Sequence, residues 1–155
     1  MSTELTWEIE SSSLEDTLLI AEQVGRNLRG GEVIELVSDL GGGKTAFVRG
    51  LAIGIGSEDT VHSPSFTISN QYQSGNFILH HLDFYRLSDA GLMKQQLAEI
   101  LSDPLSIVVV EWANIVEDIL PERHLVVTIK TTGETNRKLI FEYPEKLAYI
   151  IPNNT

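Results

Sequence analysis

The chain has 155 residues, enough to bury the core of one domain, and its hydrophobic content of 42% and charged content of 21% are ordinary for a globular fold. Its net charge of −11 argues against extensive direct nucleic-acid binding, which needs clustered lysine and arginine, and the absence of cysteine excludes disulfides, thiolate catalysis and zinc–thiolate sites. No apolar run is long enough to span a membrane and the N-terminus does not resemble a signal peptide, so we expect a cytoplasmic protein without a membrane partner.

The first third of the chain predicts a strand, a helix and a second strand. Residues 5 to 9 alternate between apolar and polar side chains, which predicts a short strand. Ser13 and Asp16 approximate a capping box, and apolar residues recur at helical spacing from residue 14 to residue 28. A pair of glycines ends this helix, and the mostly apolar residues 33 to 37 predict a buried strand.

A glycine-rich turn joins the strand at 33–37 to a helix expected from about residue 45 to residue 53. The order of strand, glycine-rich loop, Lys44, Thr45 and helix is that of a P-loop, in which backbone N–H groups converge on phosphate oxygens. Lys44 would reach the β- and γ-phosphates, and the Thr45 hydroxyl would bind Mg²⁺. Ser38 stands where the full spacing has its first glycine; if that position requires a positive φ, serine adds about 1–2 kcal/mol of strain.

The rest of the chain is rich in strands. Four β-branched residues at 107–110 suit a strand that is buried on both faces of a parallel sheet. The whole pattern predicts one three-layer α/β domain over residues 1–155, with a mostly parallel sheet, antiparallel edge strands and a loosely packed tail after residue 144. The remaining expected elements are a strand reaching about residue 72, a strand at 77–82, helices at 92–102 and 113–120, and a hairpin of 124–131 with 138–143.

Two acidic residues follow apolar strands, where a P-loop enzyme needs a group that orients Mg²⁺ and its waters or activates the attacking water. Glu111 follows the strand at 107–110, and Asp83 follows the strand at 77–82. We therefore expect catalytic roles for Lys44, Glu111 and Asp83, and metal binding by Thr45 and Glu111. Five other polar residues are weaker candidates for the site: Arg49, His62, His80, His81 and Arg86. A buried histidine at position 80 or 81 is more often a structural residue than a catalytic one.

Five ordered motifs together resemble the TsaE family, formerly called YjeE. The resemblance spans roughly residues 8 to 137 and is far more specific than the P-loop alone. The motifs are Asp-Leu-Gly-Gly-Gly-Lys-Thr (39–45), Phe-Val-Arg-Gly (47–50), Ser-Pro-Ser-Phe-Thr-Ile (63–68), His-Leu-Asp-Phe-Tyr-Arg-Leu (81–87) and Val-Val-Glu-Trp (109–112).

The resemblance implies a small P-loop ATPase that supports synthesis of N6-threonylcarbamoyladenosine in tRNA through a complex with the TsaB and TsaD proteins. It implies ATP or ADP and Mg²⁺ as cofactors, with the start of the first helix and one arginine near the base. The implied nucleotide-binding residues are Leu14, Leu40, Gly41, Gly42, Gly43, Lys44, Thr45, Ala46 and Arg137.

Two other functions remain open at this stage. A small-molecule kinase on the same scaffold would need an acceptor pocket and usually a lid that carries arginine, whereas the second half of this chain is poor in arginine. A nucleotide sensor that does not hydrolyse ATP would follow if Ser38 had abolished the activity. The acidic composition favours a protein partner over direct contact with tRNA.

Overall fold

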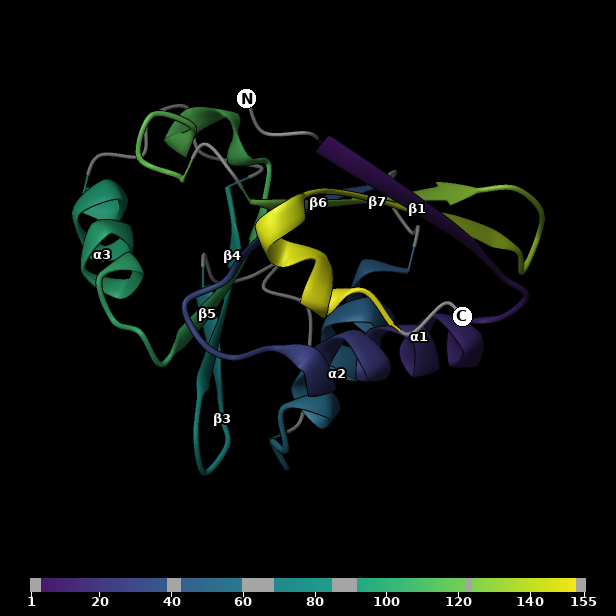
Figure 1. Ribbon diagram of the computed structural model, residues 1–155, viewed down its shortest axis with the longest axis horizontal. Coiled ribbons are helices and arrows are strands. Elements are labelled where there is room, and N and C mark those ends of the chain that lie inside the picture. The colour runs from purple at the N-terminus through teal and green to yellow at the C-terminus, as the bar shows by residue number, and fades with distance from the viewer. Residues whose placement is uncertain (1–3, 39–42, 60–68, 85–91, 122–123, 153–155) are drawn as a thin grey trace.

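A computed structural model describes residues 4–38, 43–59, 69–84, 92–121 and 124–152. In this part of the chain, seven strands form one sheet in the order β1-β7-β6-β2-β5-β4-β3 (Figure 1). The four central strands run parallel, and both edges are antiparallel. The strands are β1 (Glu4–Ser11), β2 (Val33–Ser38), β3 (Ser69–Gln73), β4 (Ile78–Asp83), β5 (Ser106–Glu111), β6 (Leu125–Thr131) and β7 (Arg137–Pro144).

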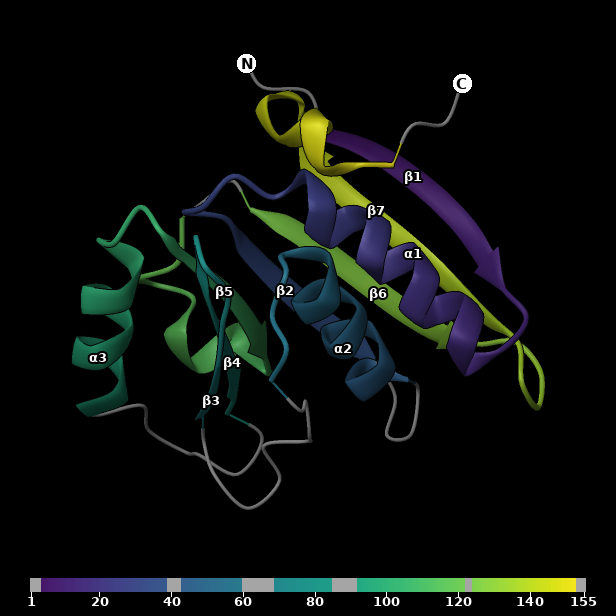
Figure 2. The same cartoon turned by 90° about the horizontal axis from the view of Figure 1, so that it is seen from below.

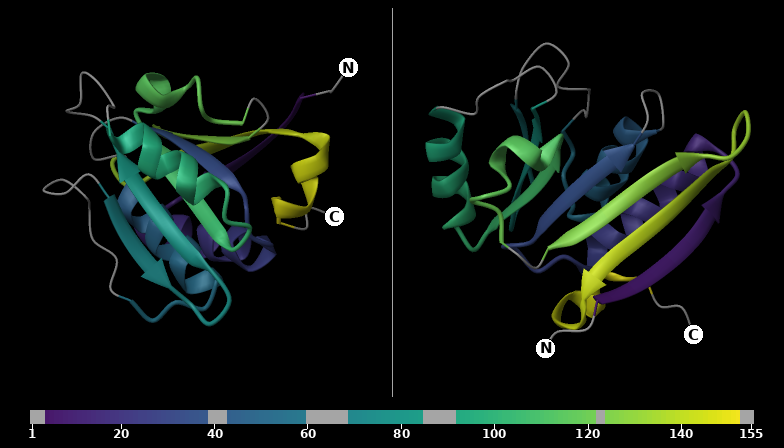
Figure 3. Two further views of the ribbon diagram at one scale, coloured as in Figure 1. Left: turned by 90° about the vertical axis from the view of Figure 1, so that its left-hand side faces the viewer. Right: turned by 90° about the horizontal axis from the view of Figure 1, so that it is seen from above.

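Helices lie on both sides of the sheet, which confirms the predicted three-layer α/β fold. Helices α1 (Leu14–Asn27) and α2 (Lys44–Gly54) lie across one face (Figure 2). Helix α3 (Leu92–Leu101) and the 3-10 turn η2 (Ala113–Val116) lie beside β4 and β5 on the opposite face (Figure 3). On that face, none of the described helices covers β6, β7 and β1. Among the described helices, none has both the length and the apolar character needed to cross a membrane.

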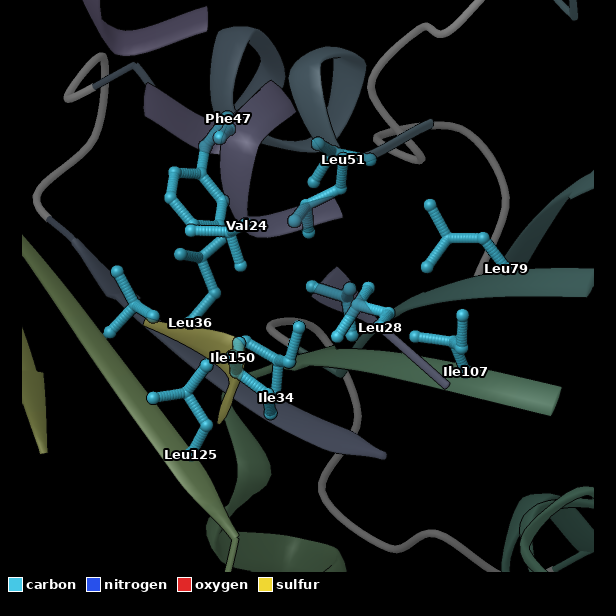
Figure 4. Close-up of a cluster of buried hydrophobic side chains, with 14 of the residues drawn as sticks. Val24, Leu28, Ile34, Leu36, Phe47, Leu51, Leu79, Ile107, Leu125 and Ile150 are labelled. Atoms are coloured by element: carbon cyan, nitrogen blue, oxygen red, sulfur yellow. The ribbon is translucent and has the colours of Figure 1, made fainter. Parts of the chain in front are cut away.

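The main core lies between the sheet and the α1–α2 pair. Alternate residues of β2 point toward these helices, so Ile34 and Leu36 are buried there against Phe47 and Leu51 of α2 (Figure 4). A second, smaller cluster lies on the opposite face and includes Leu97 of α3. Both faces of β5 are therefore buried, as the run of β-branched residues predicted.

Glycines allow α1 and α2 to pack at unusually close range. A Cβ atom added at Gly50 would lie 2.3 Å from the Leu18 carbonyl oxygen. At Gly54 the added atom would lie 2.4 Å from the Glu22 carbonyl oxygen. Because these near neighbours are backbone atoms, they cannot move aside as a flexible side chain would. The two glycines therefore fix how closely α2, which begins at Lys44, approaches α1.

For residues 145–152, the described part of the tail after Pro144, the prediction of loose packing is wrong. Residues Glu145–Ile150 form a 3-10 segment, η3, and Ile150 is fully buried within the main core. The side chain of Asn27, at the end of α1, donates a hydrogen bond of 3.0 Å to the Ile150 carbonyl oxygen. The tail packs because its apolar residues cover core that the end of α1 would otherwise leave exposed.

Candidate functional site

The carboxyl ends of the central parallel strands bring the predicted site residues to one edge of the sheet. In the register of β2 with β5, Leu36 is paired with Glu111, so β2 ends beside this acid. In the register of β4 with β5, Asp83 is paired with Glu111. The Phe84 backbone N–H donates to the Glu111 carbonyl oxygen at 3.1 Å, which keeps the ends of β4 and β5 together. This edge is where open α/β sheets bind their ligands.

The loop that follows β2 enters α2 through Gly43, which has a left-handed φ of 99°. Glycine reaches this conformation without the cost that a Cβ atom imposes. Helix α2 then begins at Lys44, followed by Thr45 and Ala46. N–H groups in the first turn of a helix have no acceptor within that helix, so they can bind an anion. Leu40, Gly41 and Gly42 lie outside the described residues.

Lys44 and Glu111 form an ion pair at the centre of this edge. The Lys44 Nζ atom lies 2.9 Å from Glu111 Oε1, and both side chains are largely buried. The other carboxylate oxygen, Oε2, accepts a hydrogen bond from His81 Nε2 of β4. The pattern of strands and loop predicted that Lys44 and Glu111 belong to one site, but it did not predict their ion pair. It did not predict the bond to His81 either, because the sequence leaves open whether His80 or His81 faces this side.

The surroundings of Glu111 keep its carboxylate charged. Burial raises the pKa of this carboxyl, but the hydrogen bonds and charges of His81 and Lys44 lower it by more, so the pKa lies below its ordinary value. The site therefore holds an anionic group beside the lysine of the loop at neutral pH. When phosphate engages the lysine, the Oε1 atom of this carboxylate can bind a cation or its water.

The donor set fits Mg²⁺ bound in the manner of a P-loop. Among the described residues, no cluster of three or more acidic, histidine or cysteine side chains is present. A P-loop site does not need such a cluster, because Mg²⁺ keeps several waters and takes one or two protein ligands together with the substrate phosphates. Glu111 and the hydroxyl of Thr45 are the two protein ligands that this arrangement would use, with Asp83 beside them on β4.

Leu14 and Arg137, which the resemblance places near the base, both lie at this edge of the sheet. Leu14 begins α1 with its side chain 57% exposed, and a Cβ atom added at Gly43 would lie 3.5 Å from Leu14 Cδ2. Leu14 therefore lies against Gly43, at the end of the glycine-rich loop. The helix cap expected from the sequence is also present, because the Ser13 hydroxyl accepts a hydrogen bond from the Asp16 backbone N–H at 3.0 Å.

Arg137 begins β7 at the same edge of the sheet, where its register partners are Ser11 of β1 and Thr131 of β6. Its guanidinium donates to the carbonyl oxygens of Gly133 and Asn136 in the preceding turn. The arginine is thus three strands away from β5 in the sheet order.

Two features of the backbone bear on the sequence predictions. Ser38 ends β2 as part of the strand, and in the described part of the chain Trp112 is the residue other than glycine that has a positive φ. The strain considered for Ser38 is therefore absent. Trp112 directly follows Glu111, is 44% exposed, and has a φ of 58° that the sequence did not reveal.

Of the other polar candidates, Arg49 is exposed on α2, whereas His62 and Arg86 lie outside the described residues.

Comparisons with known proteins agree on one family. The sequence matches the family described as threonylcarbamoyl adenosine biosynthesis protein TsaE over residues 11–139. The tRNA threonylcarbamoyladenosine biosynthesis protein TsaE of Bacillus subtilis (strain 168) is 37% identical over 127 residues, covering 82% of this chain and 79% of that protein. The protein of the same name from Treponema pallidum (strain Nichols) is 34% identical over 129 residues, covering 83% of this chain and 95% of that protein.

A solved structure supports the three-layer α/β fold described above. The crystal structure of Bacillus subtilis YdiB is similar with a TM-score of 0.74 and 31% sequence identity. The match covers 94% of this chain and 89% of that chain. The arrangement of the sheet and helices is therefore shared almost from end to end.

Proposed function

This chain belongs to the TsaE family, and on that premise we propose that it binds ATP with Mg²⁺ and hydrolyses the γ-phosphate in support of tRNA N6-threonylcarbamoyladenosine synthesis. The observation that carries the proposal is the 2.9 Å contact between Lys44 and Glu111. A lysine that begins a helix after a glycine-rich loop and a buried carboxylate at the end of a neighbouring parallel strand are the two groups that such hydrolysis requires.

In this mechanism the loop amides and the start of α2 bind the phosphates. Lys44 turns from Glu111 to the β- and γ-phosphates, where its charge offsets the charge that develops on the transferred group. Thr45 and Glu111 would hold Mg²⁺, which would neutralise phosphate charge and help to align the reacting groups. Asp83, paired in register with Glu111, orients water at the same edge. Leu14 and Arg137 would lie near the base, as the family resemblance implies.

The proposed physiological setting is a complex with TsaB and TsaD proteins. The names of the relatives support a role for this chain in threonylcarbamoyladenosine synthesis. A net charge of −11 makes a protein surface a better partner for this chain than the tRNA backbone. We therefore propose that turnover is slow for the chain alone and rises when the partner complex is present.

The test is incubation with γ-labelled ATP and Mg²⁺, with and without TsaB and TsaD. We expect the label to appear as free phosphate and the Glu111→Gln variant to be slower by about 100-fold. Label on a metabolite would instead identify a small-molecule kinase. Persistent absence of turnover with the partners present would identify a nucleotide sensor, although the unstrained Ser38 backbone removes the reason for expecting one.

A further inference from the structure

His81 of β4 is a second buried partner of Glu111, whereas Lys44 comes from the start of α2. Its side chain is 2% exposed, and Nε2 lies within hydrogen-bond distance of Glu111 Oε2. In the register of β4 with β5, His81 is paired with Val109, two residues before Glu111, so both polar side chains lie on the same face of the sheet. The two carboxylate oxygens are thus divided, with Oε1 toward Lys44 and Oε2 toward His81.

The hydrogen bonding of His81 differs from that of a histidine that only fills the core. Buried polar side chains generally have their hydrogen-bonding atoms satisfied. Within the described residues, however, His81 Nδ1 has no hydrogen-bond partner, so the ring is oriented by its contact with Glu111. The preceding residue, His80, points to the other face of β4 and contacts the Ser106 hydroxyl at 3.3 Å.

We propose that His81 is a positioning residue for Glu111. By holding Oε2, it orients the carboxylate so that Oε1 faces Lys44. Lys44 contacts Oε1, and Oε1 would be presented to Mg²⁺ or its water once the phosphates engage the lysine. The inference rests on the proposed function, because it assigns Oε1 to the magnesium site.

This role predicts an effect on one quantity, the gain in ATP affinity that Mg²⁺ provides. We would measure the dissociation constant of ATP by titration calorimetry in excess Mg²⁺ and again in EDTA. In the His81→Leu variant we expect the gain to fall by about 10-fold or more, since loss of a residue that orients a metal ligand typically has this effect. The affinity in EDTA should stay close to that of the unmodified protein, because the hydrogen bond that the structure describes for His81 goes to Glu111, the proposed magnesium ligand.

Matched variants separate positioning from packing. His81→Gln can place an amide N–H near the position of Nε2 and should restore most of the gain, whereas the shorter amide of His81→Asn should not. His80→Gln, on the same strand but on the other face, should leave the gain unchanged. The Gln and Asn pair keeps the test decisive if the leucine variant fails to fold.

Equal magnesium-dependent gains in the folded His81→Gln and His81→Asn variants, or an unaltered gain in folded His81→Leu, would overturn the role of His81 alone. If the unmodified protein gained no ATP affinity from Mg²⁺, the proposed function itself would fail, and the inference with it. The two failures are therefore distinguishable.

Discussion

Trp112 adopts φ 58° and ψ 52°, a left-handed conformation that is costly for a residue with a bulky side chain. It follows Glu111 directly, so the chain leaves the buried end of β5 through an unfavourable turn. Such outliers persist only where the surrounding structure enforces them, and they cluster at functional sites. Trp112 lies at the edge of the candidate site and is 44% exposed.

The backbone strain at Trp112 is measurable by comparing two truncations that both remove the ring. We expect Trp112→Gly to have a higher free energy of unfolding than Trp112→Ala, by about 1 kcal/mol, because only alanine retains the left-handed penalty. Denaturant titration of both variants provides the measurement. The same pair at exposed Ile53 of α2 should show the opposite order, because glycine is disfavoured in a helix. Equal stability of the two Trp112 variants would show that the turn carries no strain.

His124 should make the stability of the protein depend on pH. The hydrogen bond from its Nε2 to Glu35, at 2.9 Å, raises the pKa of this imidazole; burial opposes the rise, while the Pro121 carbonyl oxygen and the negative charges of Glu35 and Glu4 add to it. A group whose folded pKa is raised contributes stability that is fully present below its unfolded pKa. That contribution is lost as the pH rises through the folded pKa.

The corresponding test compares the protein with His124→Gln, whose amide does not titrate. We expect the stability advantage of the unmodified protein over His124→Gln to shrink by about 1 kcal/mol as the pH rises from about 6 to about 9. Parallel stability curves over that range would contradict the predicted linkage.

At the scale of elements, the site depends on how closely α1 and α2 pack. Gly50 is the sharpest test, because an added Cβ would lie 2.3 Å from the Leu18 carbonyl oxygen and 2.6 Å from Ala21 Cβ. In an isolated helix, glycine to alanine is stabilising by about 1 kcal/mol. Here we expect Gly50→Ala to lower the unfolding free energy by about 2–3 kcal/mol, because the two helices must separate.

Thermal and denaturant unfolding would measure this loss, with Gly75→Ala as the control. Gly75 lies between β3 and β4, and an added Cβ there would have nothing within 4 Å. A Gly50 variant as stable as the control would mean that the helices do not meet as closely as described.

Most of these elements could be predicted from local patterns. Apolar periodicity and turn residues placed β2, α1 and α2 within about one residue of their observed ends. Local patterns failed where the outcome depended on distant contacts. The tail after Pro144 packs because α1 and the sheet leave apolar surface for Ile150 to cover, and no pattern within the tail itself reveals that surface.

For the whole molecule, parallel strand order explains how much of the site could be predicted. A glycine-rich loop after β2 and acids after β4 and β5 must converge if these strands are parallel neighbours, as they are. The bond between His81 and Glu111 was beyond prediction, because it requires the register of two strands that are separated by α3 in the sequence. The backbone at Ser38 was likewise set by its pairing within the sheet.

The central claim is that this edge of the sheet binds ATP through Lys44 in a magnesium-dependent way. Titration calorimetry of ATP into the protein, in Mg²⁺ and in EDTA, tests it most directly when Lys44→Ala is run alongside. We expect saturable binding at one site that Mg²⁺ strengthens, and an affinity at least about 10-fold lower in the variant, which is about 1.4 kcal/mol. Folded protein that binds no ATP, or a Lys44→Ala variant that binds it as tightly as the unmodified chain, would contradict the account.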